Sequence, residues 1–139
     1  MVSGMRKSGA EFRFLYDRDG RDFLLLETGR WRGTLQFIKR NKISAVAVSQ
    51  ANGFRARSLD VLREIPSLEA LYLQEGWGDY GPVYAHPDLR WLLCGAGAAS
   101  LDLARFPALE TLRATWWPRL EGIGNLKRLN YLNLDRFRP

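Results

Sequence analysis

The chain has very few of the side chains that usually carry catalysis or bind metals. Its 139 residues include one cysteine, Cys94, and one histidine, His86. A single cysteine excludes an internal disulfide, and one cysteine with one histidine falls short of the usual zinc ligand set. Catalysis needs matched titratable groups that converge on one point. We therefore expect no catalytic residues, no metal site and no cofactor, and we predict that the protein is not an enzyme.

Long apolar runs are also missing. No stretch approaches the length of a transmembrane helix, and the opening MVSGMRKSGAEFRF lacks the apolar segment of a secretory signal. We therefore expect no membrane association and a cytoplasmic location. The apolar content of 46% is typical of a folded protein, and the length favours a single domain.

A short phrase recurs along most of the chain. Residues 66–73 read PSLEALYL and residues 107–114 read PALETLRA. The template Leu-x-x-Leu-x-Leu begins at positions 43, 68, 89, 109 and 129, which lie 25, 21, 20 and 20 residues apart. A proline stands two residues before three of these starts. The spacing of the template and the position of the proline independently indicate the same repeating unit. We therefore predict that each unit forms a short strand followed by a return segment.

This pattern resembles the leucine-rich repeat (LRR) family, and in particular small bacterial-type members with irregular repeats. The resemblance covers residues 43–139 and implies an α/β fold, a leucine-rich-repeat solenoid with about five parallel strands. One feature departs from the family. The polar residue after each strand, usually asparagine, is replaced by the residues Ala51, Gly76, Gly97, Trp117 and Phe137. We expect the glycines to permit turns of another kind.

The first part of the chain does not match the repeat. The runs EFRFLYD (residues 11–17) and RDFLLLET (residues 21–28) flank Asp19-Gly20, which predicts a β-hairpin, and Thr34 can cap a short helix after it. We expect this hairpin plus helix to cover the first open face of the repeats. The predicted organisation is one domain, residues 1–139, with a flexible tail over 1–10, an N-terminal cap over 11–42 and leucine-rich repeats over 43–139.

His86 and Cys94 each occupy a position that the repeat reserves for apolar residues. Reactive thiols need an accessible, electropositive setting, which such a position does not provide. We therefore predict a tucked, hydrogen-bonded histidine and a buried, unreactive cysteine.

Residues between the repeat leucines point away from the core, because side chains alternate along a strand. These outward positions and the turns after them hold tyrosine, tryptophan and arginine, which often anchor protein interfaces. We predict a non-catalytic module that binds another protein through this sheet face. The resemblance to small bacterial LRR proteins implies one such role, the neutralisation of a toxin or effector to which the protein binds. The candidate binding residues are Tyr72, Gln74, Trp77, Trp91, Arg113, Trp116, Trp117, Tyr131 and Asn133. Alternatively, Trp116 and Trp117 fold back and fill the core.

Two other functions fit the sequence. The net charge is +6, and residues 1–66 hold 13 Lys and Arg against 7 Asp and Glu. Nucleic-acid binding through this basic half is one alternative, although no base-stacking motif accompanies it. Its candidate residues are Arg30, Arg32, Lys39, Arg40, Lys42, Arg55 and Arg57. The other alternative is a self-associating structural protein, including a homodimer through the C-terminal edge strand, since no sixth repeat follows residue 134.

Overall fold

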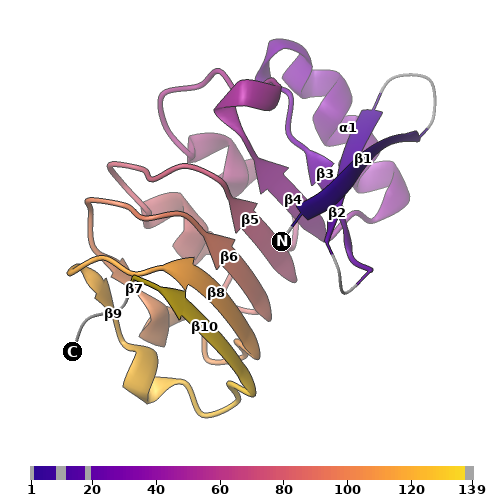
Figure 1. Ribbon diagram of the computed structural model, residues 1–139. Coiled ribbons are helices and arrows are strands. Elements are labelled where there is room, and N and C mark those ends of the chain that lie inside the picture. Colours follow the sequence, from indigo (N-terminus) through magenta and orange to yellow (C-terminus); the bar gives the residue numbers. More distant parts are fainter. Residues whose placement is uncertain (1, 9–11, 18–19, 137–139) are drawn as a thin grey trace.

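The computed structural model describes residues 2–8, 12–17 and 20–136, and its fold is α/β with a mostly parallel sheet (Figure 1). Neighbouring strands follow the order β1-β2-β3-β4-β5-β6-β8-β10. The pairs β1–β2 and β2–β3 are antiparallel, and every later pair is parallel. These strands are β1 Val2–Ser8, β2 Phe12–Asp17, β3 Asp22–Leu25, β4 Ala45–Val48, β5 Ala70–Leu73, β6 Trp91–Cys94, β8 Thr111–Thr115 and β10 Tyr131–Asp135.

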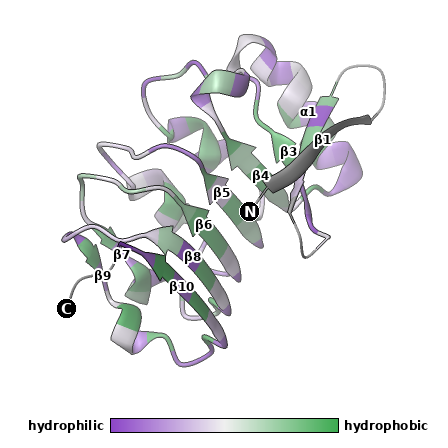
Figure 2. Ribbon diagram, viewed as in Figure 1, coloured by the Kyte–Doolittle hydropathy of each residue, from purple (hydrophilic) through white to green (hydrophobic). Residues whose placement is uncertain are grey.

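Shorter elements lie in the segments that return from one strand to the next. A second parallel pair joins β7 Leu101–Asp102 to β9 Leu120–Glu121. The α-helix is α1 Trp31–Asn41, and the 3-10 helices are η1 Thr28–Arg30, η2 Gln50–Asn52, η3 Asp60–Glu64, η4 Gly81–Ala85, η5 Leu103–Arg105 and η6 Ile123–Asn125. Hydrophobic residues follow the central strands, whereas α1 and the outer turns are more hydrophilic (Figure 2).

The five repeat segments pair in the register that the sequence predicts. Each observed strand begins two residues after the template start, because the first leucine still belongs to the turn. The middle position of the template then forms one row across the sheet, Val46, Leu71, Leu92, Leu112 and Leu132. The predicted parallel arrangement of these segments is thus confirmed.

The front of the chain differs from its prediction in two places. The hairpin is present as β2 and β3, although Asp19 of its turn lies outside the described residues. The helix begins at Trp31, so Thr34 is a buried interior residue whose hydroxyl donates to the Arg30 carbonyl at 3.0 Å instead of a cap. Residues 2–8, expected within a flexible tail, form β1 and pair with β2.

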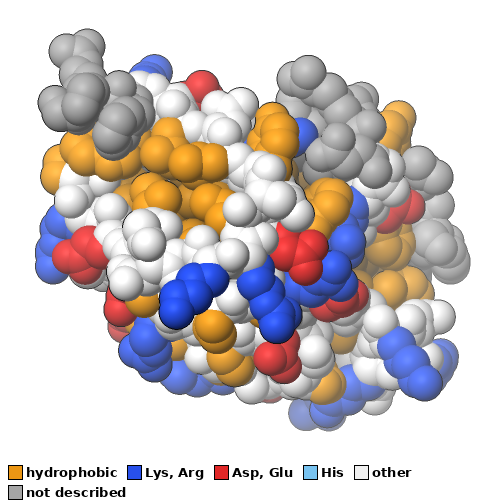
Figure 3. All heavy atoms as spheres, turned by 90° about the horizontal axis from the view of Figure 1, so that it is seen from below, with side chains coloured by type: hydrophobic (Ala, Val, Ile, Leu, Met, Phe, Trp, Pro, Cys, Tyr) orange, Lys and Arg blue, Asp and Glu red, His pale blue; other side chains and the backbone are white. Residues whose placement is uncertain are grey.

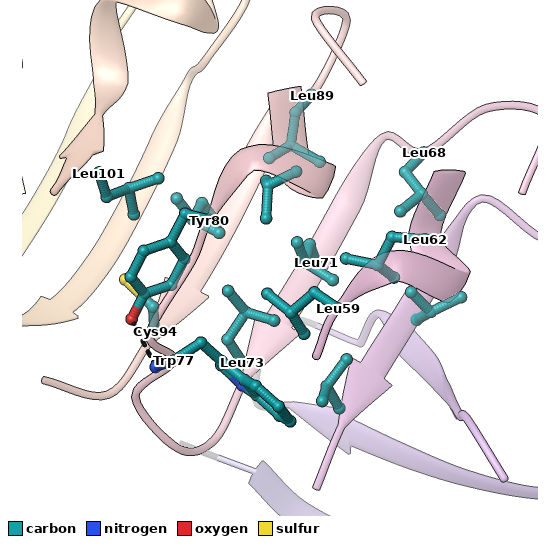
Figure 4. Close-up of a cluster of buried hydrophobic side chains, with 14 of the residues drawn as sticks. Leu59, Leu62, Leu68, Leu71, Leu73, Trp77, Tyr80, Leu89, Cys94 and Leu101 are labelled. Carbon is teal, nitrogen blue, oxygen red and sulfur yellow. Dashed lines mark hydrogen bonds between the residues drawn. The ribbon is translucent and has the colours of Figure 1, made fainter. Parts of the chain in front are cut away.

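The main core lies between the sheet and the return segments. Leucines from the strands and from the 3-10 helices meet there, as the cluster in Figure 4 shows. Trp77, Tyr80 and Trp117 are buried among them. The Trp77 backbone N–H donates to the Tyr80 hydroxyl at 3.1 Å, and the Tyr80 and Trp117 rings stack with centroids 5.9 Å apart. These aromatic side chains fill the main core beside the turns that follow the strands.

Close packing of successive turns explains two glycines in these turns. A Cβ at Gly76 would collide with the Ala96 carbonyl oxygen, and one at Gly97 would collide with the Tyr80 hydroxyl. Neither glycine has a positive φ, so space rather than backbone conformation demands glycine there. The expected role of backbone freedom is therefore not seen at these two glycines, where close packing accounts for the missing side chain.

Candidate functional site

The sheet face opposite the main core carries three rows of side chains. In one row lie Ala45, Ala70, Trp91, Thr111 and Tyr131, and in the next lie Ala47, Tyr72, Leu93, Arg113 and Asn133. The third row begins with Ser49 and Gln74 and ends with Thr115 and Asp135. The repeat pattern predicts one outward surface for all of these positions, but the structure divides the surface into two halves of different character.

The N-terminal half of this face is a second hydrophobic cluster. Phe23, Leu25 and Leu15 of the hairpin join Ala45, Ala47, Ala70 and Leu93, and all seven side chains are buried. The hairpin reaches this face because Leu25 pairs with Ala47 and Phe23 lies two residues before it. The alanines and Leu93 lie on the side away from the main core, as the repeat predicts, but the hairpin covers them and they are buried rather than exposed. The apolar residues Leu15, Phe23 and Leu25, which alternate with the core-facing ones, were the signal in the sequence.

Trp91 and Tyr72 border this cluster and are partly buried. The Arg21 guanidinium lies 4.3 Å from the centroid of the Trp91 ring, an arrangement in which a cation is attracted to the ring face. The Tyr72 ring meets Phe23 edge-on with centroids 6.3 Å apart. Trp91 thus contacts the hairpin across the small side chains of β4 and β5, which leaves it less available to a partner than predicted.

The C-terminal half of the face contains a hollow of about 500 Å³. Five of the predicted binding residues line it, namely Tyr72, Gln74, Arg113, Tyr131 and Asn133. They come from β5, β8 and β10 and from the residue after β5. Gly95, Thr115 and Asp135 also line the hollow, and Asp135 is the charged member that the predicted set omitted.

The hollow combines hydrogen-bonding groups with both signs of charge. The Arg113 guanidinium lies 5.3 Å from the centroid of the Tyr131 ring, whose side chain is 44% exposed. Burial, with a further contribution from Glu75, raises the pKa of Tyr72 above its ordinary value. Tyr72 therefore keeps its proton near neutral pH and offers a hydroxyl donor. These groups suit the recognition of a polar surface, because each can exchange hydrogen bonds with a partner.

Trp77 and Trp117 do not belong to this surface. Both are buried in the main core, and Trp117 Nε1 donates to the Ala99 carbonyl at 2.9 Å. The Phe54 and Trp77 rings meet edge-on with centroids 5.4 Å apart. Their predicted binding role is wrong for this reason, and for Trp117 the core-filling alternative holds. Trp116 is half-buried and packs against the core from the turn after β8.

His86 and Cys94 occupy the positions that the repeat predicts. His86 is buried, and its Nε2 lies 2.7 Å from the Leu62 carbonyl oxygen. A carbonyl only accepts, so Nε2 carries the proton. Burial lowers the pKa of His86 below its ordinary value, and the bond to Leu62 partly offsets that effect. Cys94 is also buried, and burial raises the pKa of its thiol to about 12. The predictions of a hydrogen-bonded histidine and a buried cysteine are confirmed.

The basic residues of the first half are spread over several elements. Arg32, Lys39, Arg40 and Lys42 are exposed on α1 or directly after it, and Arg55 and Arg57 are exposed after η2. Arg30 forms an ion pair with Glu27, with Nη2 and Oε2 2.9 Å apart. On the face that Figure 3 shows, acidic side chains lie among the basic ones.

In the part of the chain that the structure describes, no group of three or more His, Cys, Asp or Glu side chains is placed to hold a metal ion. No helix of residues 2–8, 12–17 and 20–136 has the length and apolar character needed to cross a membrane.

Comparison with known proteins gives no match. No family model, no curated protein and no solved structure is similar to this chain at a significant level.

Proposed function

We propose that the protein is a non-catalytic leucine-rich-repeat solenoid that binds another protein through the C-terminal half of its sheet face. The observation that carries this proposal is the hollow, around which five residues predicted from the repeat come together. They lie far apart in the sequence, from Tyr72 to Asn133, and only the in-register strands bring them to one place.

The side chains around the hollow are of the types that dominate binding energy at protein interfaces. Tyrosine and arginine are enriched among such residues, and Tyr72, Arg113 and Tyr131 supply three of them here. The buried cluster of the N-terminal half supports the same location. Because the hairpin already covers that half, a partner has access mainly to the strands from β5 to β10.

The partner belongs to the class of folded proteins that present a polar loop with both an acidic and a hydrogen-bonding side chain. The acidic group would pair with Arg113, while hydroxyl and amide groups would meet Tyr72 and Asn133. Neutralisation of a cognate toxin or effector is one role that such binding would serve, and it rests on the resemblance to small bacterial LRR proteins.

The test is cross-linked capture from extract of the source cells, with two matched variants. We expect one protein to be retained by the wild type and by Arg63→Ala, which removes an exposed arginine from η3 in a return segment. The same protein is lost with the double variant Arg113→Ala and Tyr131→Ala. Equal retention by all three proteins would show that the hollow is not the binding site.

Nucleic-acid binding is the second candidate, and the exposure of Arg32, Lys39, Arg40 and Lys42 favours it. A complex with six or more phosphate contacts loses roughly 10³-fold or more in affinity when salt rises from about 50 to 200 mM. We expect no saturable, salt-sensitive complex with DNA or RNA. If one forms and weakens when Arg30, Arg32 and Lys42 are replaced by alanine together, this second function replaces the first.

A further inference from the structure

The outer edge of β10 has no neighbouring strand among the described residues, because β10 pairs with β8 alone. The Tyr131 N–H donates to the Glu110 carbonyl at 3.1 Å, and the Asp135 carbonyl accepts from the Trp116 N–H at 2.8 Å, so the backbone groups of Tyr131 and Asp135 face β8. Backbone direction alternates along a strand, and the groups of Leu132 and Leu134 therefore face the opposite edge.

The side chains of β10 have an equally regular arrangement. Leu132 and Leu134 lie on the core side, and Leu132 is 46% exposed. Tyr131, Asn133 and Asp135 lie on the side of the hollow. The strand thus presents two leucines on one side and three polar-tipped residues on the other, with Asn133 at its centre.

We propose that β10 pairs antiparallel with β10 of a second copy of this chain, about a twofold axis at Asn133. In this register Leu132 of one copy lies opposite Leu134 of the other, and their outward N–H and C=O groups exchange two hydrogen bonds at each such pair. Tyr131 lies opposite Asp135, which places a hydroxyl donor across from a carboxylate. Each Asn133 lies opposite its own counterpart.

Antiparallel registers shifted by one or two residues are less favourable. A shift by one residue sets the outward-facing groups of Leu132 against residues whose groups face β8, and no hydrogen bonds form across the edge. A shift by two sets Leu132 against Arg136, or Leu129 against Asp135, and so places a leucine against a charge. Arg136 has a positive φ of 61°, which ends the strand directly after Asp135 and fits a symmetric pairing of five residues.

The same axis has a consequence for the hollow. Tyr131, Asn133 and Asp135 line it on the side nearest the outer edge of β10. In the dimer the two hollows therefore lie next to each other, and Asp135 of the second copy reaches Tyr131 of the first. The dimer itself stands independently of the partner protein proposed above.

Cysteine cross-linking tests the register directly. Directly opposed residues in non-hydrogen-bonded pairs have Cα atoms about 4.5 Å apart, which is within the range that a disulfide spans. We expect Asn133→Cys to form an intermolecular disulfide under mild oxidation. Neither Tyr131→Cys nor Asp135→Cys is expected to cross-link alone, but a mixture of these two variants is expected to do so.

Sedimentation equilibrium over a dilution series tests the edge hydrogen bonds. Leu132→Pro removes an outward N–H that makes no hydrogen bond among the described residues, while Leu132→Ala shortens the side chain and keeps the N–H. We expect dimer dissociation constants at least about tenfold higher for the proline variant, because each dimer loses two hydrogen bonds. Circular dichroism checks that both variants fold. A wild type that stays monomeric at high micromolar concentration, or efficient cross-linking of Tyr131→Cys alone, would overturn the proposal.

Discussion

Arg90 donates two hydrogen bonds to Glu110 on the neighbouring unit, from Nε to Oε2 at 2.8 Å and from Nη2 to Oε1 at 3.1 Å. Its Nη1 also donates to Glu69 at 3.2 Å. The three residues stand at the same place in successive units, directly before β5, β6 and β8. Opposite charges therefore alternate along the N-terminal ends of these strands. Their attraction favours the observed register over a slipped one.

Replacing the guanidinium is expected to change the titration of Glu110. Hydrogen bonding to Arg90 holds the pKa of Glu110 below its ordinary value of 4.5. A depressed folded-state pKa contributes stability above the unfolded-state pKa, and that contribution is lost as pH falls through the folded-state value. We expect Arg90→Gln to raise the pKa of Glu110 and to remove this part of the acid dependence, as measured by carboxyl NMR titration. Arg128→Gln is the matched control, with a smaller effect.

His86 is expected to make stability fall on mild acidification. Its pKa lies below the unfolded value of 6.5 because burial disfavours the charged ring. The unfolded chain then takes up a proton first, so the free energy of unfolding decreases as pH falls below roughly 6.5. In His86→Gln we expect a flatter dependence in this range, together with a loss of about 1–3 kcal/mol near neutral pH if the Leu62 carbonyl is left unpaired. Urea unfolding at a series of pH values measures both. A parallel pH dependence in the two proteins would contradict this assignment.

A methyl group at Gly95 is expected to be costly. A Cβ there would approach the Gln74 carbonyl oxygen to 2.5 Å, and that atom belongs to the backbone of the adjoining turn. We expect Gly95→Ala to lower the free energy of unfolding by about 1–3 kcal/mol, as overpacked sites do. Gly78→Ala is the control, because nothing lies within 4 Å of its Cβ position. Denaturant unfolding of the two variants provides the comparison, and equal stabilities would refute the close stacking of these turns.

Cys94 is expected to react slowly with thiol reagents in the native state. With the pKa raised to about 12, its thiolate is scarce at mildly alkaline pH. Relative to an ordinary thiol near 8.5, the thiolate fraction falls on the order of 10³-fold. The labelling rate in native buffer and in denaturant gives the ratio, with Gln74→Cys as an exposed reference in the same chain. Native labelling of Cys94 as fast as that of the reference would exclude a buried thiol.

Phe23 is expected to matter for the stability of the whole sheet. Its side chain is fully buried in the second hydrophobic cluster, between the hairpin and the repeat strands. We expect Phe23→Ala to lower the free energy of unfolding by about 3–5 kcal/mol, whereas Tyr131→Ala at the exposed edge costs less than about 1 kcal/mol. Thermal and urea unfolding measure both. A small effect at Phe23 would mean that the hairpin packs only loosely on the repeats.

The strands and their register were predictable because the leucine columns repeat. Five copies of the template constrain the alignment, so a misplaced start in one unit conflicts with the other four. The residues that form the row from Val46 to Leu132 could therefore be aligned from the sequence alone. His86 and Cys94 were predictable for the same reason, since the column that each occupies is apolar in the other units.

Burial of half the sheet face was not predictable from the repeat. It depends on the pairing of Leu25 with Ala47, which joins a segment outside the repeat to one inside it. Alanine at positions 45, 47 and 70 fits an exposed strand as well as a tightly covered one, so composition did not decide between them. Trp77 and Trp117 lie in turns without a strict period, and their aromatic rings suit a core and an interface equally.

The pairing of the parallel strands also indicates the order in which the chain can fold. Successive strands pair residues that are only 25, 21, 20 and 20 positions apart, for example Ala45 with Ala70 and Thr111 with Tyr131. Each of these strands pairs with the strand of the preceding unit, so its partner is already present when it is synthesised. Loop closure over such short distances costs little entropy and favours rapid folding. The chain is thus suited to fold progressively during synthesis, with one exposed growing edge at every stage, and β10 is the last described strand to take that position.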